Sequence, residues 1–90
     1  MEQISKAQLE QTVKELIAHK LGLEFDEVSL SSRFSEDLSA DSLDAVECVM
    51  LMEHEFDIYI SDAESKKVHT VEDLYEICLQ KLIERDLIID

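Results

Sequence analysis

The spacing of apolar residues constrains the fold of this 90-residue chain more than any other feature. In three stretches the apolar residues recur every three or four positions, which is the spacing of an amphipathic helix. The chain has one Gly and no Pro, and this scarcity disfavours an all-β fold built on tight turns. We therefore expect an all-α protein, a small bundle of three main helices plus one short helix, with a long loop after the first helix.

The first helix is expected from about Ser5 to Leu21. Ser5 and Gln8 form the pattern of a capping box at its start. Gly22 follows the last residue of the helix, which is the position where a left-handed C-cap is expected. The 19 residues from Leu23 to Asp41 lack helical periodicity and form a loop that is long for so small a domain. We expect the loop to lie over the helices, anchored by its spaced apolar side chains: Leu23, Val28, Leu30, Phe34 and Leu38.

The second helix is expected to begin at the pair Asp41-Ser42 and to end at about Phe56. A short third helix begins at Ser61, where Ser61 and Glu64 repeat the capping-box pattern. In both places a small polar side chain stands ready to accept a hydrogen bond from a backbone N–H that lacks a partner within the helix.

The fourth helix is expected to begin at Thr70, with Asp73 three residues on, and to extend to about Arg85. Its apolar face consists of Val71, Leu74, Tyr75, Cys78 and Leu82. The chain reads as a single domain over residues 1–90, with a core of about residues 4–85. Residues 86–90 are expected to be a C-terminal extension, because the apolar run Leu87-Ile88-Ile89 has no place in the helical pattern.

The charge of the chain restricts its partners. Eight Lys and Arg stand against 22 Asp and Glu, which gives a formal net charge of −14. Binding to nucleic acid needs a basic footprint, and an anionic membrane surface attracts basic segments, so both partners are disfavoured. A strongly acidic protein instead attracts basic protein partners through its long-range field.

The two cysteines and the N-terminal segment point to a compartment. Cys48 and Cys78 fall on apolar helix faces, so we expect buried free thiols in a reducing environment rather than a disulfide. The first residues lack the apolar core of a signal peptide, and no run approaches the roughly 18 apolar residues of a membrane span. We expect a soluble cytoplasmic protein without membrane insertion.

The second helix carries two apolar stripes, where a surface helix normally has one. The first is Ala45, Cys48, Val49, Met52 and Phe56, and the second is Leu43, Val46 and Met50. Both stripes could be core, with the helix at the centre of the bundle. Alternatively, the second stripe is partly exposed and meets a partner, with Asp44, Glu47 and Glu53 as a charged rim, which is the usual anatomy of an interface. Leu51 fits neither stripe.

Ser42 lies in the first turn of this helix. Its ordinary role there would be an N-cap, alone or shared with Asp41. As a nucleophile it lacks a general base nearby, since His19, His54 and His69 lie on separate segments. Another enzyme that supplies its own base and metal could still modify this hydroxyl.

The stretch from Asp37 to Phe56, DLSADSLDAVECVMLMEHEF, closely resembles the acyl carrier proteins of type II fatty acid synthesis. Its centre, Asp41-Ser42-Leu43-Asp44, matches the family's motif for attachment of a prosthetic group. The resemblance continues through the downstream segments and covers about residues 4–83. The matching downstream segments are Asp57-Ile58, Ile60-Ser61-Asp62 and Thr70-Val71-Glu72-Asp73.

The resemblance implies a carrier without catalytic activity of its own. It implies that Ser42 carries 4′-phosphopantetheine through a phosphodiester, and that Asp41 helps to orient the Mg²⁺ complex of the phosphopantetheinyl transferase. The thiol of the arm would hold acyl groups as thioesters. The face read by basic partner enzymes would consist of Leu43, Asp44, Val46, Glu47, Met50 and Glu53.

The partners implied by the resemblance are that transferase and the basic-surfaced enzymes that process acyl groups: malonyl transferase, ketosynthase, ketoreductase, dehydratase, enoyl reductase and acyltransferases. The carrier is expected to be a monomer. A specialised carrier for polyketide, nonribosomal peptide or other lipid assembly shares the same motif. An acidic protein-binding adaptor of the same fold that is never modified is a further alternative.

The sequence departs from the usual family pattern in three places. Ser39 replaces the Gly common just before the motif and would be strained if the position needs a positive φ. Ser61 replaces the Pro usual at the start of the short helix, where it can serve as N-cap. The chain also runs several residues past the usual end. These departures keep a specialised carrier open as the alternative.

No metal site is expected. A calcium loop starting at Asp37 would need Gly at its sixth position and Glu at its twelfth, where this chain has Ser42 and Cys48. A zinc site needs clustered Cys and His, and here Cys48 and His54 are six residues apart while the others are distant in sequence.

Overall fold

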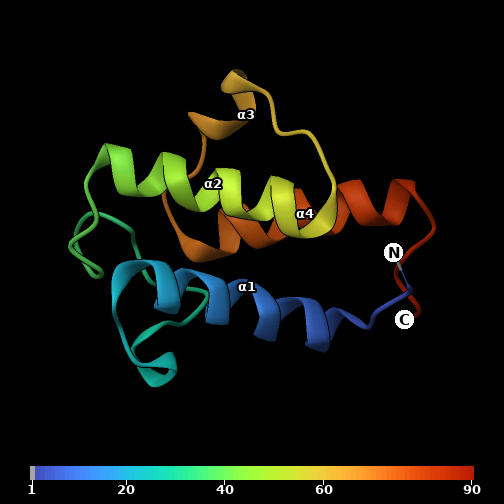
Figure 1. Cartoon of the computed structure of the whole chain (residues 1–90), viewed down its shortest axis with the longest axis horizontal. Coiled ribbons are helices and arrows are strands. Elements are labelled where there is room, and N and C mark those ends of the chain that lie inside the picture. Colours follow the sequence, from blue (N-terminus) through green and yellow to red (C-terminus); the bar gives the residue numbers. More distant parts are fainter. Residues whose placement is uncertain (1) are drawn as a thin grey trace.

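The structure is a computed structural model that describes residues 2–90, and in that range it is helical, as expected. The helices are α1 (Lys6–Leu21), the 3₁₀ turn η1 (Phe25–Glu27), α2 (Ser42–Phe56), α3 (Asp62–Ser65) and α4 (Val71–Glu84). Figure 1 shows α1 running against the direction of α2 and α4, with α3 on the far side of α2 from α1. No helix within residues 2–90 is long and apolar enough to cross a membrane.

The predicted starts of three helices are confirmed by capping boxes. The side chains of Ser5, Ser61 and Thr70 each accept a hydrogen bond from the backbone N–H three residues on. In each case the side chain of that third residue accepts a hydrogen bond from the backbone N–H of the N-cap. At the other end of α1, Gly22 has φ 70° and is the left-handed C-cap that the sequence predicts.

The core lies where α1, α2 and α4 meet. α1 packs against both α2 and α4, and α2 packs against α4. Of the first stripe of α2, Cys48, Val49, Met52 and Phe56 are buried and Ala45 is half-buried. Cys48 and Cys78 are buried free thiols, and burial raises the pKa of Cys48 to about 11 and that of Cys78 to about 12. Both thiols are therefore protonated and serve as core side chains.

The loop between α1 and α2 is anchored as the sequence predicts. Its side chains Val28, Phe34 and Leu38 are buried, and Leu23 and Leu30 are half-buried against the core. The backbone of the loop is also bonded to the start of α4. The N–H of Phe34 donates to the carbonyl of His69 at 3.0 Å, and the N–H of Val71 donates to the carbonyl of Ser32 at 3.0 Å. These bonds fix the segment that leads into α2.

The C-terminal segment differs from the expected extension. After α4, Asp86 adopts φ 57° and the chain turns back towards the segment that leads into α1 (Figure 1). Ile4 pairs with the segment in a parallel β-bridge, its N–H donating to the carbonyl of Leu87 and its carbonyl accepting from Ile89. Leu87 and Ile88 pack against the core. Residues 86–90 are therefore part of the packed domain, because two backbone hydrogen bonds and apolar contacts hold them there.

Candidate functional site

Ser42 is the first residue of α2 and is exposed. The N-cap is Asp41, whose carboxylate accepts a hydrogen bond from the N–H of Asp44 at 2.8 Å. Within residues 2–90 the Ser42 hydroxyl has no hydrogen-bond partner. The interpretation of Ser42 as the cap is therefore wrong, because its neighbour satisfies the helix end. The hydroxyl is left exposed at the positive end of the helix dipole.

The backbone that leads into α2 is held in a strained conformation. Ser39 has φ 55°, in the left-handed region that favours glycine, so the concern raised by the sequence is justified. The next residue, Ala40, is buried, and its N–H donates to the carbonyl of Phe34 at 2.8 Å. The turn at Ser39 thus buries Ala40 against the loop and leaves Asp41 and Ser42 at the surface.

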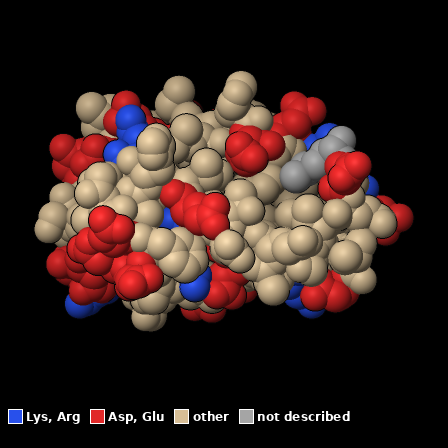
Figure 2. Space-filling model, turned by 60° about the horizontal axis from the view of Figure 1, so that its bottom comes forward, with Lys and Arg blue, Asp and Glu red and all other residues tan. Residues whose placement is uncertain are grey.

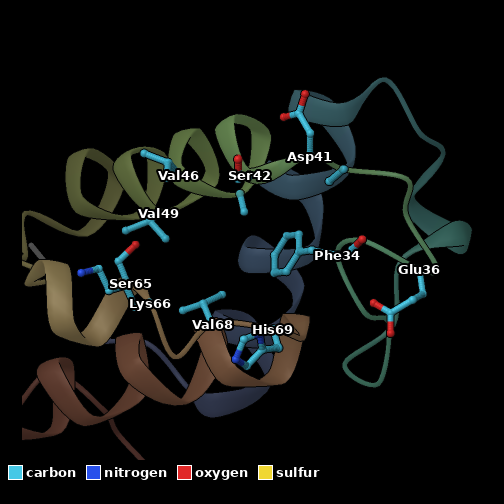
Figure 3. Close-up of a pocket in the computed structure, with 13 residues that line it drawn as sticks. Phe34, Glu36, Asp41, Ser42, Val46, Val49, Ser65, Lys66, Val68 and His69 are labelled. Atoms are coloured by element: carbon cyan, nitrogen blue, oxygen red, sulfur yellow. The ribbon is translucent and has the colours of Figure 1, made fainter.

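A hollow of about 430 Å³ lies beside Ser42, between the loop, α2, the end of α3 and the segment that joins α3 to α4 (Figure 3). Phe34, Val49 and Val68 are among its apolar lining residues. Asp41, Ser42, Glu36, Lys66 and His69 contribute its polar lining. A chain attached to Ser42 would therefore have an apolar surface within reach.

The second stripe of α2 faces solvent. Leu43 is 64% exposed, Val46 46% and Met50 58%. The interpretation of both stripes as core is wrong, since the first stripe is sufficient to cover α1 and α4. Three large apolar side chains in a row on one helix leave an exposed apolar strip beside Ser42, and such strips mark interaction sites.

The three carboxylates of the expected rim have different partners. Asp44 is half-buried and its carboxylate accepts from the N–H of Asp41 at 3.2 Å. Glu53 is half-buried and accepts from the N–H of Ile60 at 2.9 Å, so it also holds the segment between α2 and α3. Glu47 instead forms an ion pair with Lys20 of α1, with Nζ and Oε1 3.4 Å apart.

A smaller hollow of about 250 Å³ lies on the same face, between α1 and α2. It is lined by Lys20, Glu47, Met50, Leu51 and His54. Leu51, which fits neither stripe, thus lies half-buried at the seam of the two helices. The sequence gives no sign of this hollow, since a helical wheel of α2 alone does not contain α1.

Acidic side chains outnumber basic ones, 22 to eight. On the face shown in Figure 2 the acidic side chains form several separate groups, the densest at the left, and only a few basic side chains are visible. Within residues 2–90, ion pairs engage Lys14, Lys20, Arg33, Lys81 and Arg85, which leaves most of the 22 carboxylates without a cationic partner. The field around the exposed strip is therefore negative and attracts cationic surfaces.

The structure is a small helical domain with an exposed serine at the start of α2, and comparison with known proteins places it among the carrier proteins. The family model described as a phosphopantetheine attachment site matches residues 11–78. An acyl carrier protein of Chlorobium phaeobacteroides is 38% identical over 78 residues, which is 87% of this chain and 100% of that protein. The crystal structure of an acyl carrier protein from Thermotoga maritima superposes with a TM-score of 0.77 at 34% identity, covering 90% of this chain and 94% of that one.

The chain belongs to the acyl carrier protein family. Members of this family are carriers rather than catalysts, and their partners are enzymes that process acyl groups.

Proposed function

We propose that this protein is modified on Ser42 with 4′-phosphopantetheine and delivers acyl groups, bound as thioesters, to the enzymes of fatty acid synthesis. The observation that carries the proposal is the exposed Ser42 hydroxyl at the start of α2, in a chain whose family model is that of a phosphopantetheine attachment site. The site is suited to such a group because Ser42 is exposed to solvent and its hydroxyl makes no hydrogen bond within residues 2–90.

The attachment would form a bond from Ser42 Oγ to phosphorus. The pyrophosphate bond of coenzyme A would break, so that its phosphopantetheinyl group passes to Ser42 and adenosine 3′,5′-bisphosphate leaves. A base on the transferase would take the hydroxyl proton. Ser42 cannot do this alone, since no histidine or carboxylate is hydrogen-bonded to it within residues 2–90. The Asp41 carboxylate, next to it, would help to orient the Mg²⁺ that the transferase brings. When bound, the group supplies a thiol on a flexible arm that holds the acyl cargo.

The partner surface would be the exposed strip Leu43, Val46 and Met50 with its carboxylate rim, Asp44, Glu47 and Glu53. Apolar anchors would give affinity, and the negative field would speed the encounter with basic partners. Those partners would be the transferase and the fatty acid synthesis enzymes, from malonyl transferase and ketosynthase to acyltransferases. The two buried thiols suit a reducing compartment, in keeping with a cytoplasmic carrier.

The test is the mass of the intact protein after incubation with coenzyme A, Mg²⁺ and a broad-specificity transferase. The wild type should gain one phosphopantetheinyl group, and Ser42→Ala should gain none. Ser35→Ala is the matched control, because Ser35 is also exposed and lines the same hollow, and this variant should be modified like the wild type. An unmodified wild type would overturn the proposal in favour of the unmodified adaptor. A modified Ser42→Ala would overturn the assignment of the attachment to Ser42.

The pathway is a separate question from the attachment. Ser39, in place of the Gly common before the motif, and the segment beyond the usual C-terminal end depart from the family pattern. They keep open the alternative of a specialised carrier for polyketide, nonribosomal peptide or other lipid assembly. Loading of the modified protein by a malonyl transferase, followed by elongation with a fatty acid ketosynthase, distinguishes the two. A carrier that is modified but never elongated belongs to a specialised pathway.

A further inference from the structure

Glu47 differs from the other rim carboxylates in the kind of partner it has. Asp44 and Glu53 accept hydrogen bonds from backbone N–H groups, which cannot move away without disturbing a helix end. Glu47 is paired with the side chain of Lys20, on the neighbouring helix α1. Its negative charge is therefore neutralised within the free protein by a group that can leave.

The geometry of the pair favours release. Nζ of Lys20 and Oε1 of Glu47 are 3.4 Å apart, longer than the roughly 2.7–2.9 Å of a tight charge-assisted hydrogen bond. The side chains are 33% and 40% exposed, so water competes for both charges. A lysine ammonium is a strongly hydrated point charge on a flexible stem, and it can swing into solvent while the stem stays packed.

The pair also stands at the edge of an exposed hollow. Lys20, Glu47 and His54 surround the space of about 250 Å³ whose apolar walls are Met50 and Leu51. Met50 belongs to the exposed strip, so the hollow is continuous with it. This combination matches an arginine side chain, whose aliphatic stem would lie on Met50 and Leu51 and whose guanidinium would meet the Glu47 carboxylate.

We propose that Lys20 is an internal competitor for Glu47 and tunes which partners bind the α1–α2 hollow. A partner must displace the Lys20 ammonium before it gains the Glu47 carboxylate. A partner arginine does so readily, because its planar fork can bind the carboxylate bidentately, whereas a partner lysine offers only the same point charge that Lys20 already supplies. The protein therefore selects arginine over lysine at this position. This inference rests on the proposed function, since it concerns the surface that partner enzymes would read.

The first experiment measures kcat/KM for modification by a broad-specificity transferase at low salt. Loss of an exposed ion pair changes an equilibrium constant by roughly two- to fivefold. Lys20→Gln should therefore raise kcat/KM by about that factor. Removing any lysine also makes the protein more acidic. Lys6→Gln is therefore the matched control, since Lys6 is the first residue of α1, at the opposite end from Lys20, and exposed. It should raise kcat/KM less than Lys20→Gln does.

The double variant isolates the competition. On a Glu47→Gln background there is no carboxylate to compete for, so Lys20→Gln should have no more effect than Lys6→Gln. Lys20→Arg should lower kcat/KM, because arginine holds Glu47 more firmly. Equal effects of Lys20→Gln and Lys6→Gln, or an undiminished effect on the Glu47→Gln background, would overturn the inference. Thermal unfolding of every variant shows that the fold is intact.

A second experiment needs no modification at all, and so separates failure of this inference from failure of the proposed function. Arginine amide and lysine amide are titrated into the apo-protein, and the NMR signals of Glu47, Met50 and Leu51 are followed. In Lys20→Gln these signals should respond to arginine amide at about two- to fivefold lower concentration than in Lys6→Gln. Within Lys20→Gln, the response to lysine amide should be weaker than the response to arginine amide. An identical response of the two variants would reject the competition even if Ser42 is modified as proposed.

Discussion

Asp41 and Asp44 hold each other's backbone at the start of α2. The Asp41 carboxylate accepts from the N–H of Asp44 at 2.8 Å, and the Asp44 carboxylate accepts from the N–H of Asp41 at 3.2 Å. Ser42 lies between them, in the first turn, with its hydroxyl free of this exchange. The two aspartates cap the helix, and the serine hydroxyl therefore stays available for modification.

Substitution of Asp41 should separate its capping role from a role in modification. Asp41→Ala removes the cap and should lower stability by about 0.5–2 kcal/mol, whereas Asp41→Asn keeps an equally good capping side chain and should stay near the wild type. If Asp41 also orients the Mg²⁺ of a transferase, Asp41→Asn should still slow modification of Ser42. Thermal unfolding and intact mass with time measure the two effects. A fully active Asp41→Asn would limit Asp41 to capping.

Ser39→Gly should stabilise the protein. At φ 55° an L-residue is strained by about 1–2 kcal/mol, and glycine relieves this strain at the expense of a more flexible unfolded chain. The net gain should be about 0.5–1 kcal/mol, which in a domain of this size raises the melting temperature by roughly 2–8 °C. Ser35→Gly, in the same loop at a residue without a positive φ, is the control and should not stabilise. A lower melting temperature for Ser39→Gly would show that the serine side chain contributes contacts that outweigh the strain.

Local patterns account for most of what the sequence predicted correctly. The capping boxes at Ser5, Ser61 and Thr70 and the left-handed Gly22 are decided within four residues of chain, so the pattern alone predicts them. The burial of one stripe of α2 and the exposure of the other could not be decided in this way. A helical wheel of α2 shows two apolar stripes. Which of them is buried depends on how many other helices pack around α2, and the wheel does not contain that information.

The features that escaped the sequence all join residues far apart in the chain. The pairing of Ile4 with Ile88, the ion pair of Lys20 with Glu47 and the hollow at Leu51 depend on how the helices meet. No periodicity within one segment encodes these contacts. The assignment of the Ser42 cap failed for a different reason: Asp41 and Ser42 are both good caps, and sequence alone does not say which of two adjacent polar residues takes the position.

The Asp73 carboxylate should make stability depend on pH. Burial raises its pKa, but hydrogen bonds from the N–H groups of His69 and Thr70 and from the Thr70 side chain outweigh burial, so its pKa lies below the ordinary value. A carboxylate with a lowered pKa stabilises the fold above its unfolded value of about 3.9, and this stability is lost as pH falls through the folded value.

The measurement for Asp73 compares unfolding of the wild type and Asp73→Asn in denaturant between pH 7 and pH 3. The wild type should be the more stable at neutral pH, and the difference should shrink as the pH falls below about 4. Glu76→Gln, an exposed carboxylate on the same helix, is the control for loss of one negative charge. A difference between wild type and Asp73→Asn that is constant over the range would contradict the prediction.

Added salt should raise the melting temperature at neutral pH. Twenty-two carboxylates surround a small domain with eight Lys and Arg, and their repulsion opposes the compact state. Screening shortens the range of this repulsion to about 8 Å at physiological ionic strength, and MgCl₂ should act at lower concentration than NaCl because a divalent ion binds between carboxylates. The same titration at pH 4, where many carboxylates are protonated, should show a weaker response. A melting temperature that neither salt changes at pH 7 would show the repulsion to be unimportant.

Truncation should destabilise the protein strongly in the buried stripe of α2 and very little in the exposed stripe. Phe56 is 2% exposed and belongs to the buried stripe, so Phe56→Ala should lower stability by about 3–5 kcal/mol, the range for deleting a buried aromatic. Met50 is 58% exposed, so Met50→Ala should change stability by less than about 0.5 kcal/mol. If the exposed strip is a partner surface, Met50→Ala should nevertheless slow modification of Ser42, because it removes an apolar anchor.

Phe56→Leu keeps this comparison informative should Phe56→Ala fail to fold, since it removes less volume and should stay folded but less stable than the wild type. Thermal unfolding and the rate of mass gain with a transferase measure both stripes in the same set of variants. Strong destabilisation by Met50→Ala would contradict this prediction and show that the second stripe contributes to the core. A stable Met50→Ala that is modified as fast as the wild type would leave the strip exposed but without a role in binding the transferase.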